Sequence, residues 1–266
     1  MKLRVGVVGA SGRTGSLVLE ELQGHPRLTL SAAIVSSSST ALGRVVAVAG
    51  ERRDIPSGEA PVLFSADLAE LKGSVGVIDF STPETSVAVA LTCADLGIPL
   101  LVATTGLSSE QLSAIKEGAK RIAIGITPNT SVGAAVLGMV SQQAQRLLGS
   151  DFDVEVMEIH HKMKRDAPSG TAKAIVQGLL HGAVDEPKTP IFGRLGERRA
   201  NEIGVASLRG GGVPGDHTVY FLGASERLEL SHKVNDRRVF ARGALLFFER
   251  LLGKSRGEYA ASDLLA

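Results

Sequence analysis

Short apolar runs alternate with helical periodicities along the first half of the chain. The run Leu3–Val8 is rich in apolar and β-branched residues, as expected of a strand buried on both faces, and Leu17, Val18 and Leu22 then recur at helical spacing. Strands that alternate with helices predict right-handed βαβ units around a parallel sheet. Further strands are expected at Leu28–Val35, Val75–Phe80, Leu100–Ala103 and Ile122–Ile126, helices at Pro83–Leu96 and Ser109–Arg121, and a loop or partly ordered insertion at Thr40–Ala60.

The pattern changes after Asn129, where a long apolar-periodic helix is followed by strands with polar and apolar positions in alternation. Helices and consecutive strands in this order predict an α+β layer on a mixed sheet, so the fold class is α/β with a second, α+β domain. We expect one domain at residues 1–129 plus 239–266 and the other at residues 130–238. The expected elements are helices at Gly133–Leu148, Ala172–His181 and Phe240–Leu252, a strand at Phe152–Ile159, and antiparallel strands at Gly204–Arg209, His217–Leu222 and Arg227–His232 around the turn Gly210–Gly212.

A glycine-rich turn joins the first strand to the first helix. Its sequence is Gly9-Ala10-Ser11-Gly12-Arg13-Thr14-Gly15. Glycines permit a tight turn and let backbone N–H groups approach a pyrophosphate, and the helix that follows presents its positive end. The position of this turn in a βαβ pattern favours a dinucleotide site, and the alternative is a tight turn without a ligand.

The second strand ends without the carboxylate that holds the ribose hydroxyls in many NAD-binding units. The chain reads Ile34-Val35-Ser36-Ser37-Ser38-Ser39 at that point. The hydroxyl and N–H groups of Ser36–Ser39 are expected to tolerate or bind a 2′-phosphate, and Arg13, within the glycine turn, is expected to reach it. We therefore expect NADPH or NADH as cofactor, with NADPH favoured; the alternative is that the serines form only a polar turn.

The segment from Glu158 to Ala172 concentrates titratable groups beside the start of a helix. It holds His160, His161 and Lys164 just after a strand, and Pro168-Ser169-Gly170-Thr171 then opens the helix. Exposed N–H groups and hydroxyls at a helix start bind carboxylates, and nearby cations favour a small dianion. A histidine there titrates in the range that a proton donor needs. The alternative is a solvated basic loop in front of a capped helix.

Composition removes several other classes of protein. The chain has 266 residues, with 29 Lys and Arg against 28 Asp and Glu, and this net charge of +1 does not favour a nucleic-acid binder. The single cysteine, Cys93, excludes an internal disulfide and lies in an apolar helix pattern typical of a core residue. No apolar run approaches a membrane span, and no Cys/His cluster has metal-ligand spacing. A cytoplasmic protein without membrane, nucleic-acid or metal partners is expected, with His217 and His232 in packing or surface roles.

The His160 segment resembles the signature of dihydrodipicolinate reductase, also called 4-hydroxy-tetrahydrodipicolinate reductase. The resemblance covers nearly the whole chain and implies a Rossmann-like dinucleotide-binding domain, a substrate domain and a homotetramer built through the substrate domains. It also implies NAD(P)H-dependent reduction of a cyclic imine dicarboxylate to tetrahydrodipicolinate in bacterial lysine and diaminopimelate synthesis. The other matching segments are Gly9–Arg13, Asp79–Glu84, Thr104–Gly106, Asn129–Gly133, Gly215–Thr218, Glu226–Glu229, Ser231–Lys233 and Phe240–Ala244.

The resemblance also carries residue roles onto this chain. His160 is the expected general acid and Lys164 a second proton donor. The expected pyrophosphate site is Gly9, Ala10, Ser11, Gly12, Arg13 and Thr14, and the expected nicotinamide site is Ala103, Thr104, Thr105, Thr127, Pro128, Asn129 and Thr130. The expected substrate ligands are His161, Lys164, Ser169, Gly170 and Thr171. Two alternatives remain: a different two-domain oxidoreductase such as an amino-acid dehydrogenase, and a catalytically inactive NAD(P)-binding sensor that lacks a working donor.

Overall fold

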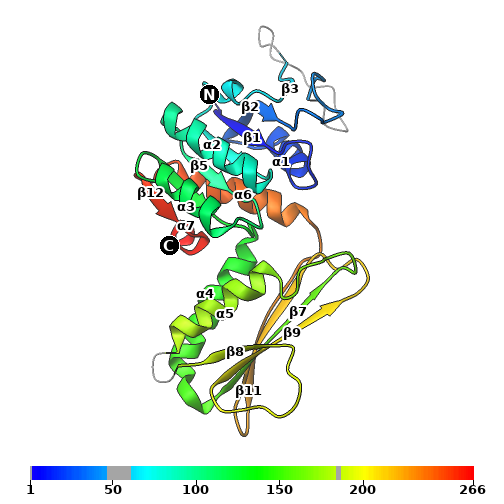
Figure 1. The fold of residues 1–266 in the computed structure, drawn as a ribbon, viewed down its shortest axis with the longest axis vertical. Helices are drawn as coiled ribbons and strands as arrows, with labels where there is room; N and C mark the ends of the chain where they lie inside the picture. The colour runs from blue at the N-terminus through cyan, green and yellow to red at the C-terminus, as the bar shows by residue number, and fades with distance from the viewer. Residues whose placement is uncertain (1, 47–60, 184–186) are drawn as a thin grey trace. The chain divides into compact units, whose positions relative to one another are not determined.

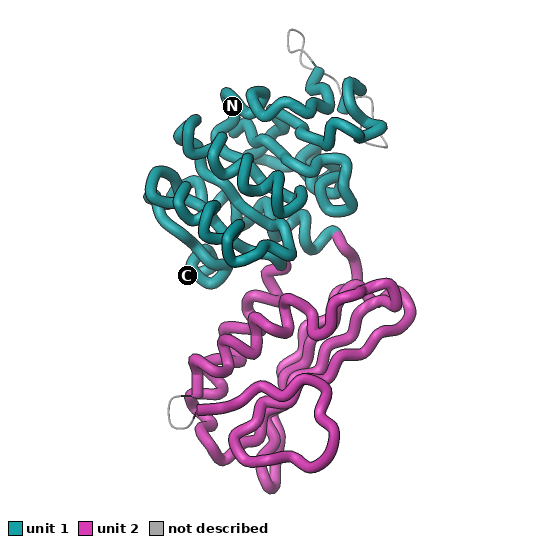
Figure 2. The backbone as a smooth tube through the Cα atoms, viewed as in Figure 1, with its two compact units in different colours: residues 1–130, 238–266 teal, residues 131–237 magenta. Residues whose placement is uncertain are grey.

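The computed structural model describes residues 2–46, 61–183 and 187–266. The chain divides into two compact units, Met1–Thr130 with Arg238–Ala266, and Ser131–Arg237 (Figure 2). The boundaries expected from the sequence lie one residue away from these. Each unit has its own sheet and its own apolar core (Figure 1).

The first unit is built on a seven-stranded sheet in the order β12-β6-β5-β4-β1-β2-β3, and every pairing in it is parallel. The strands are β1 (Leu3–Val8), β2 (Leu28–Ile34), β3 (Phe64–Ser65), β4 (Gly76–Asp79), β5 (Leu100–Val102), β6 (Ala123–Ile126) and β12 (Gly257–Tyr259). The strand order reverses between β1 and β4, and in open α/β sheets the crevice beyond the carboxyl ends of the strands at such a point holds ligands. The expected parallel, Rossmann-like sheet is confirmed.

Helices cover both faces of this sheet (Figure 1). This is expected because crossover connections between parallel strands are right-handed as a rule and the strand order reverses between β1 and β4. α1 packs against α6, and α2 packs against α3. The fully buried strand side chains, such as Val7, Ile78 and Leu101, explain why β1, β4 and β5 are almost continuously apolar. The helices are α1 (Gly15–Gln23), α2 (Pro83–Leu96), α3 (Ser109–Gly118), α6 (Arg238–Leu251) and α7 (Ala261–Leu265), with a short 3-10 helix at Leu68–Leu71.

The second unit packs two helices against a mixed sheet in the order β11-β10-β7-β9-β8. The central strand β7 is antiparallel to β10 and parallel to β9, and β10 and β11 form an antiparallel hairpin. The core between helices and sheet contains Val154, Val156, Ile175, Leu179 and Phe221. The elements are α4 (Val132–Leu148), a 3-10 helix (Gly149–Asp151), β7 (Asp153–His160), α5 (Gly170–Gly182), β8 (Thr189–Phe192), β9 (Glu202–Arg209), β10 (Asp216–Leu222) and β11 (Arg227–Lys233).

One sequence-based expectation about this sheet is wrong. Gly204–Arg209 was expected beside His217–Leu222 as its antiparallel neighbour, but β7 lies between them and β9 runs parallel to β7. The turn Gly210–Gly212 instead passes over the end of β7, where Gly210 N–H donates to the His160 carbonyl. Alternation of polar and apolar residues predicts a strand but does not select its partner.

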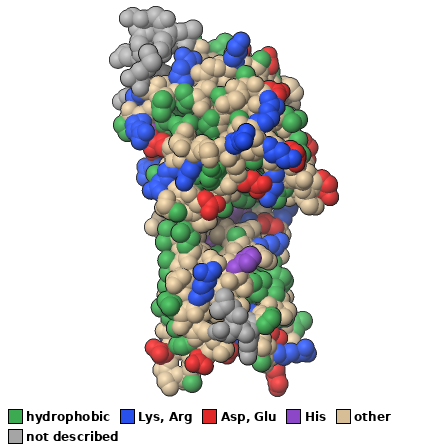
Figure 3. All heavy atoms as spheres, turned by 90° about the vertical axis from the view of Figure 1, so that its left-hand side faces the viewer, with side chains coloured by type: hydrophobic (Ala, Val, Ile, Leu, Met, Phe, Trp, Pro, Cys, Tyr) green, Lys and Arg blue, Asp and Glu red, His purple; other side chains and the backbone are tan. Residues whose placement is uncertain are grey.

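Three short strands were not expected from the sequence: β3, β8 and β12. Of the expected insertion at residues 40–60, residues 47–60 lie outside the described part of the chain. Over the face drawn in Figure 3, positive and negative side chains are interspersed, in keeping with the net charge of +1.

Candidate active site

The glycine turn of the first unit is packed so tightly at Gly9 and Gly15 that neither position has room for a side chain. Gly9 has a φ of +73°, and a Cβ added there would collide with the Phe80 carbonyl, while one added at Gly15 would collide with the Gly9 carbonyl. The Thr14 side chain makes no capping hydrogen bond to α1. Of the other residues of the turn, the structure exposes Ser11, Gly12 and Arg13 and buries Ala10. An exposed turn in front of an uncapped helix start fits a pyrophosphate.

The serine turn after β2 lies against the glycine turn. Ser11 Oγ is 3.3 Å from Ser39 Oγ, and Ser36 Oγ is 2.8 Å from Ser38 Oγ. The structure therefore brings together the two segments expected to hold the pyrophosphate and the ribose. Ser36 is exposed.

Three of the four threonines of the expected nicotinamide site turn their hydroxyls inward. Thr104 is buried and its Oγ1 donates to Asp79 Oδ2 at 3.2 Å. The hydroxyls of Thr127 and Thr130 donate to backbone carbonyls at 2.9 and 2.7 Å. Ala103 is buried as well, whereas Thr105 and Pro128 are exposed and Asn129 is half-buried. What the buried threonines can offer a cofactor is backbone groups, not hydroxyls.

Asp79 explains the inward orientation of Thr104. Its carboxyl group is fully buried at the end of β4 and also accepts hydrogen bonds from Ser86 Oγ at 2.5 Å and from the Ser81 N–H at 2.9 Å. Burial raises the pKa of the Asp79 carboxyl, and the hydrogen bonds from the two serines and Thr104 oppose that rise. The carboxyl group fixes the loop after β4 to the loop after β5, and sequence reasoning had given it no such role.

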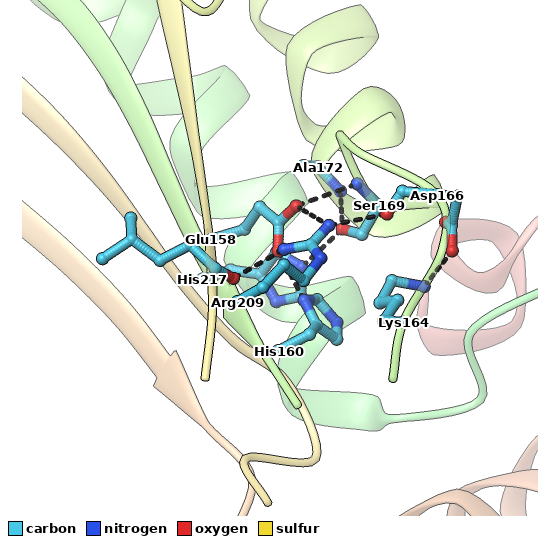
Figure 4. Close-up of polar contacts among 9 residues, drawn as sticks. Glu158, His160, Lys164, Asp166, Ser169, Ala172, Arg209 and His217 are labelled. Carbon is cyan, nitrogen blue, oxygen red and sulfur yellow. Dashed lines mark hydrogen bonds and ion pairs between the residues drawn. The ribbon is translucent and has the colours of Figure 1, made fainter. Parts of the chain in front are cut away.

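In the second unit, a buried carboxylate organises the end of β7 (Figure 4). Glu158 is fully buried, and both its oxygens accept from the Arg209 guanidinium at 2.8 Å. His160 Nδ1 lies 2.5 Å from Glu158 Oε2. Because successive strand residues point to opposite faces, Glu158 and His160 lie on one face of β7. Arg209 reaches the carboxylate from the end of β9.

These contacts set the charge of each partner. Burial works to raise the pKa of the Glu158 carboxyl, but the hydrogen bonds, led by that of Arg209, outweigh it and lower this pKa to about 2. Burial lowers the pKa of His160, and the Glu158 carboxylate partly offsets that effect. Lys164 and Arg209 add to the lowering through their positive charges. Glu158 is therefore a permanent anion that holds the Nδ1 side of the ring, so that Nε2 is the nitrogen left for proton transfer.

Ser169 connects this pair to α5. Its N–H donates to Glu158 Oε1 at 3.1 Å, and its Oγ accepts from the Ala172 N–H at 3.1 Å and lies 3.0 Å from His217 Nε2. Ser169 is thus buried and caps the helix, and these contacts occupy both its N–H and its hydroxyl. Gly170, the first residue of α5, is exposed and Thr171 is half-buried. Contact between substrate and α5 is therefore expected at Gly170 and Thr171 more than at Ser169.

The cations of the expected substrate site lie on the loop between β7 and α5. Lys164 Nζ is 2.9 Å from Asp166 Oδ1, and the Asp166 carbonyl accepts from Arg209 at 2.6 Å. The His161 N–H donates to the Val213 carbonyl. Hydrogen bonds therefore hold this loop to Arg209 at the end of β9 and to the segment that follows β9, at Gly211 and Val213. The structure brings His160, Lys164 and the start of α5 together, as the sequence predicted (Figure 4).

Sequence reasoning missed two members of this cluster. Arg209 had no expected role. His217 is buried in a packing role, one of the two roles expected for it, but its ring packs edge-to-face against His160, and this contact was not expected. The match at Gly215–Thr218 was the only signal for His217. Cys93 is buried in the core, as predicted. Within the described residues, no group of three His, Cys, Asp or Glu could hold a metal ion, and no helix is long and apolar enough to span a membrane.

Two family models match consecutive stretches of the chain. The N-terminal model of dihydrodipicolinate reductase matches residues 3–130, and its C-terminal model matches residues 133–265. The chain belongs to the dihydrodipicolinate reductase family. The resemblance predicted from the motifs is thereby confirmed, as is the enzyme class, an oxidoreductase that uses a nicotinamide dinucleotide.

Relatives within the dihydrodipicolinate reductase family align over almost the full chain. A 4-hydroxy-tetrahydrodipicolinate reductase from Anaeromyxobacter dehalogenans (strain 2CP-C) is 40% identical and covers 98% of this chain and 97% of its own length. One from Rhodopseudomonas palustris (strain TIE-1) is 37% identical over 99% and 97% of the two chains. The structure of a dipicolinate-bound dihydrodipicolinate reductase from Paenisporosarcina sp. TG-14 has the same fold, with a TM-score of 0.76 at 21% identity and 100% coverage of both chains.

Proposed function

We propose that this chain reduces a cyclic imine dicarboxylate to tetrahydrodipicolinate in lysine and diaminopimelate synthesis, with His160 as the principal proton donor and Lys164 as a second one. The bound reduced nicotinamide supplies the hydride. The observation that carries the assignment of the donor is the buried Glu158–His160 pair beside Lys164 and the start of α5. The relatives named as 4-hydroxy-tetrahydrodipicolinate reductases support the choice of substrate.

The roles of the protein groups follow from charge. Glu158 stabilises the imidazolium form of His160 and fixes the ring through Nδ1, which leaves the Nε2 proton for the product that forms after hydride addition. A dianionic substrate bound nearby adds negative charge and raises the share of protonated His160. Lys164, already near His160, supplies a cation for one carboxylate. Gly170 and Thr171 supply helix-start groups for a carboxylate, and His161 adds a further contact from the same loop.

We propose NADPH as the preferred cofactor. The end of β2 carries no acidic residue that would repel a 2′-phosphate, since Val35 and Ser36 stand there. Ser36 lies in the serine turn, which contacts the glycine turn through Ser39 and Ser11. Arg13 is exposed on the glycine turn and supplies a positive charge. The absence of a carboxylate at this position supports NADPH over NADH.

We also propose a cytoplasmic homotetramer that assembles through the five-stranded sheet. Several large apolar side chains of this sheet are exposed, among them Phe192 and Leu208, at 52% and 44%. Exposed apolar residues on strands are typical of surfaces that bind another protein. Light scattering behind size-exclusion chromatography tests this state, and a monomer at micromolar concentration would contradict it.

A coupled assay tests the function. Dihydrodipicolinate synthase generates the unstable substrate in situ, and oxidation of NADPH and NADH is followed separately. His160→Gln is expected to lower kcat by about 10²–10⁴-fold with unchanged affinity for the cofactor. His181→Gln, at the end of α5, is the matched control. Wild-type turnover in His160→Gln would refute the donor assignment. No oxidation by the folded, cofactor-binding wild type would refute the substrate assignment and favour an inactive sensor.

A further inference from the structure

Glu158 and His160 at the end of β7, Ser169 before α5 and His217 on β10 form a closed cycle of contacts. His160 pairs with Glu158, Glu158 accepts from the Ser169 N–H, and the Ser169 hydroxyl lies 3.0 Å from His217 Nε2. The imidazole of His217 closes this cycle, because it packs edge-to-face on the imidazole of His160, with the centroids 5.2 Å apart and an interplanar angle of 76°. The donor is thus linked to the start of α5 along two routes, through Glu158 and through His217 (Figure 4).

The surroundings of His217 set its charge. Its Nε2 lies 3.0 Å from Ser169 Oγ, a hydroxyl that also accepts from the Ala172 N–H and that donates to Nε2 or accepts from it according to the tautomer of the ring. Burial lowers the pKa of His217 to about 4, and the positive charges around it act in the same direction. Those groups are His160, His232 and Lys164, and Glu158 alone opposes them. His217 is therefore uncharged at neutral pH and adds no cation beside the donor.

The chain contains the same arrangement a second time, away from the donor. His232 lies directly opposite His217 in the β10–β11 register, and its Nε2 is 3.0 Å from Ser131 Oγ, which caps α4. Each of the two helices of this unit therefore starts at a serine that contacts a strand histidine. The two arrangements differ in the ring contact, which in the described residues joins His217, and not His232, to His160.

We propose that His217 is a positioning residue for the reduction: its uncharged ring supports the ring of His160, and its Nε2 anchors the serine that begins the substrate-binding helix. The proposal rests on the role of His160 as proton donor. Two functions are assigned to one side chain, and they are separable. The ring contact acts on proton transfer, and the hydrogen bond acts on the binding of the substrate carboxylate.

Two substitutions separate these functions. His217→Gln keeps a hydrogen-bond partner for Ser169 but removes the ring, so kcat is expected to fall about tenfold, because a misplaced donor slows proton transfer, with a smaller change in KM. Water replaces the ring, and the pKa of His160 rises because burial is the main cause of its lowering. His217→Phe keeps a ring but removes the hydrogen-bond partner, so KM for the substrate is expected to rise about three- to tenfold with little change in kcat.

His232→Gln and His232→Phe are the matched controls. His232→Gln keeps a hydrogen-bond partner for Ser131 and His232→Phe removes it. Both lower stability, but both leave the pH dependence of kcat as in the wild type. If the His217 variants lower only the thermal midpoint, or if the His232 variants change kcat and KM in the same way, His217 is a core residue and the proposal is refuted.

A second readout does not depend on turnover. Histidine ring signals in two-dimensional NMR spectra report the titration of His160 directly, and the chain has only 6 histidines to assign. The proposal expects His160 to titrate at higher pH in His217→Gln and as in the wild type in His217→Phe and in both His232 variants. An unchanged titration in His217→Gln overturns the ring contact. This result is independent of the substrate, so it stays informative even if the coupled assay shows no reduction.

Discussion

Replacing Glu158 by glutamine removes the carboxylate that contacts His160 Nδ1 while keeping the shape of the side chain. The pKa of the Glu158 carboxyl falls from 4.5 to about 2 in the folded protein. That difference corresponds to about 3 kcal/mol of folding free energy at pH 7. The carboxylate is fully buried and Arg209 is largely buried, so little solvent screening reduces this value. Glu158→Gln is therefore expected to be about 3 kcal/mol less stable than the wild type at pH 7.

The pH dependence follows from the same shift. Between pH 4.5 and about 2 the folded wild type holds fewer protons than the unfolded chain, so the contribution of Glu158 is complete above pH 4.5 and is lost as the pH falls towards 2. Glu158→Gln lacks this group. The difference in the free energy of unfolding between the wild type and Glu158→Gln should therefore be nearly constant from pH 7 to 5 and fall to roughly half by pH 3.

Urea unfolding followed by circular dichroism, repeated across this pH range, measures the difference. Glu229→Gln is the control, because Glu229 pairs with Arg227 on the exposed surface of β11, where such a pair is worth at most about 1 kcal/mol. A difference below about 1 kcal/mol for Glu158→Gln at pH 7, or one that does not change between pH 5 and 3, would refute the idea that Glu158 is a stabilised anion in the fold.

Three further perturbations test other parts of the structure. A Cβ added at Gly215 would lie 2.9 Å from His160 Nε2, so Gly215→Ala is expected to lower kcat by about 10- to 100-fold with unchanged secondary structure, and wild-type turnover would contradict the packing described. Ser36→Asp should lower kcat/KM for NADPH by at least about tenfold and leave that for NADH nearly unchanged, measured in the coupled assay; equal losses with both would argue against 2′-phosphate contact. Burial lowers the pKa of His217 from about 6.5 in the unfolded chain to about 4 in the folded protein, so protonating the buried ring should lower the free energy of unfolding by about 3 kcal/mol as the pH falls from 6.5 to 4. His217→Phe should abolish that part of the pH dependence, and an unchanged dependence would contradict the burial of an uncharged ring.

The sequence predicted the first unit well for a physical reason. Its strands are buried on both faces and parallel, so Leu3–Val8 and its neighbours read as apolar runs, and glycine marks the turn after the first of them. The strand order of the second unit was less accessible, because β7 pairs with β9, which lies far along the chain, and nothing local encodes that choice. The short strands β8 and β12 carry too few residues for a period to be recognised.

The residues of the candidate active site also fall into those that the sequence predicts and those that only the assembled sheet reveals. His160, Lys164 and the start of α5 lie within one short segment, and their residue types were sufficient to predict a cluster. Arg209 and His217 reach it from β9 and β10, so their contribution appears only when the sheet is assembled. The inward hydroxyl of Ser169 also depends on a partner far along the chain.

The position of β7 at the centre of its sheet has a consequence for motion. Amides in a central strand, paired on both sides, exchange with solvent only through large-scale unfolding, whereas amides in an edge loop exchange through small local openings. The strand that carries Glu158 and His160 therefore belongs to the most slowly exchanging part of this unit, while the loop that carries Lys164 belongs to a faster one. The loop that carries Lys164 can consequently rearrange around a ligand on short timescales, while His160 and Glu158 keep their mutual geometry as long as the sheet stays folded.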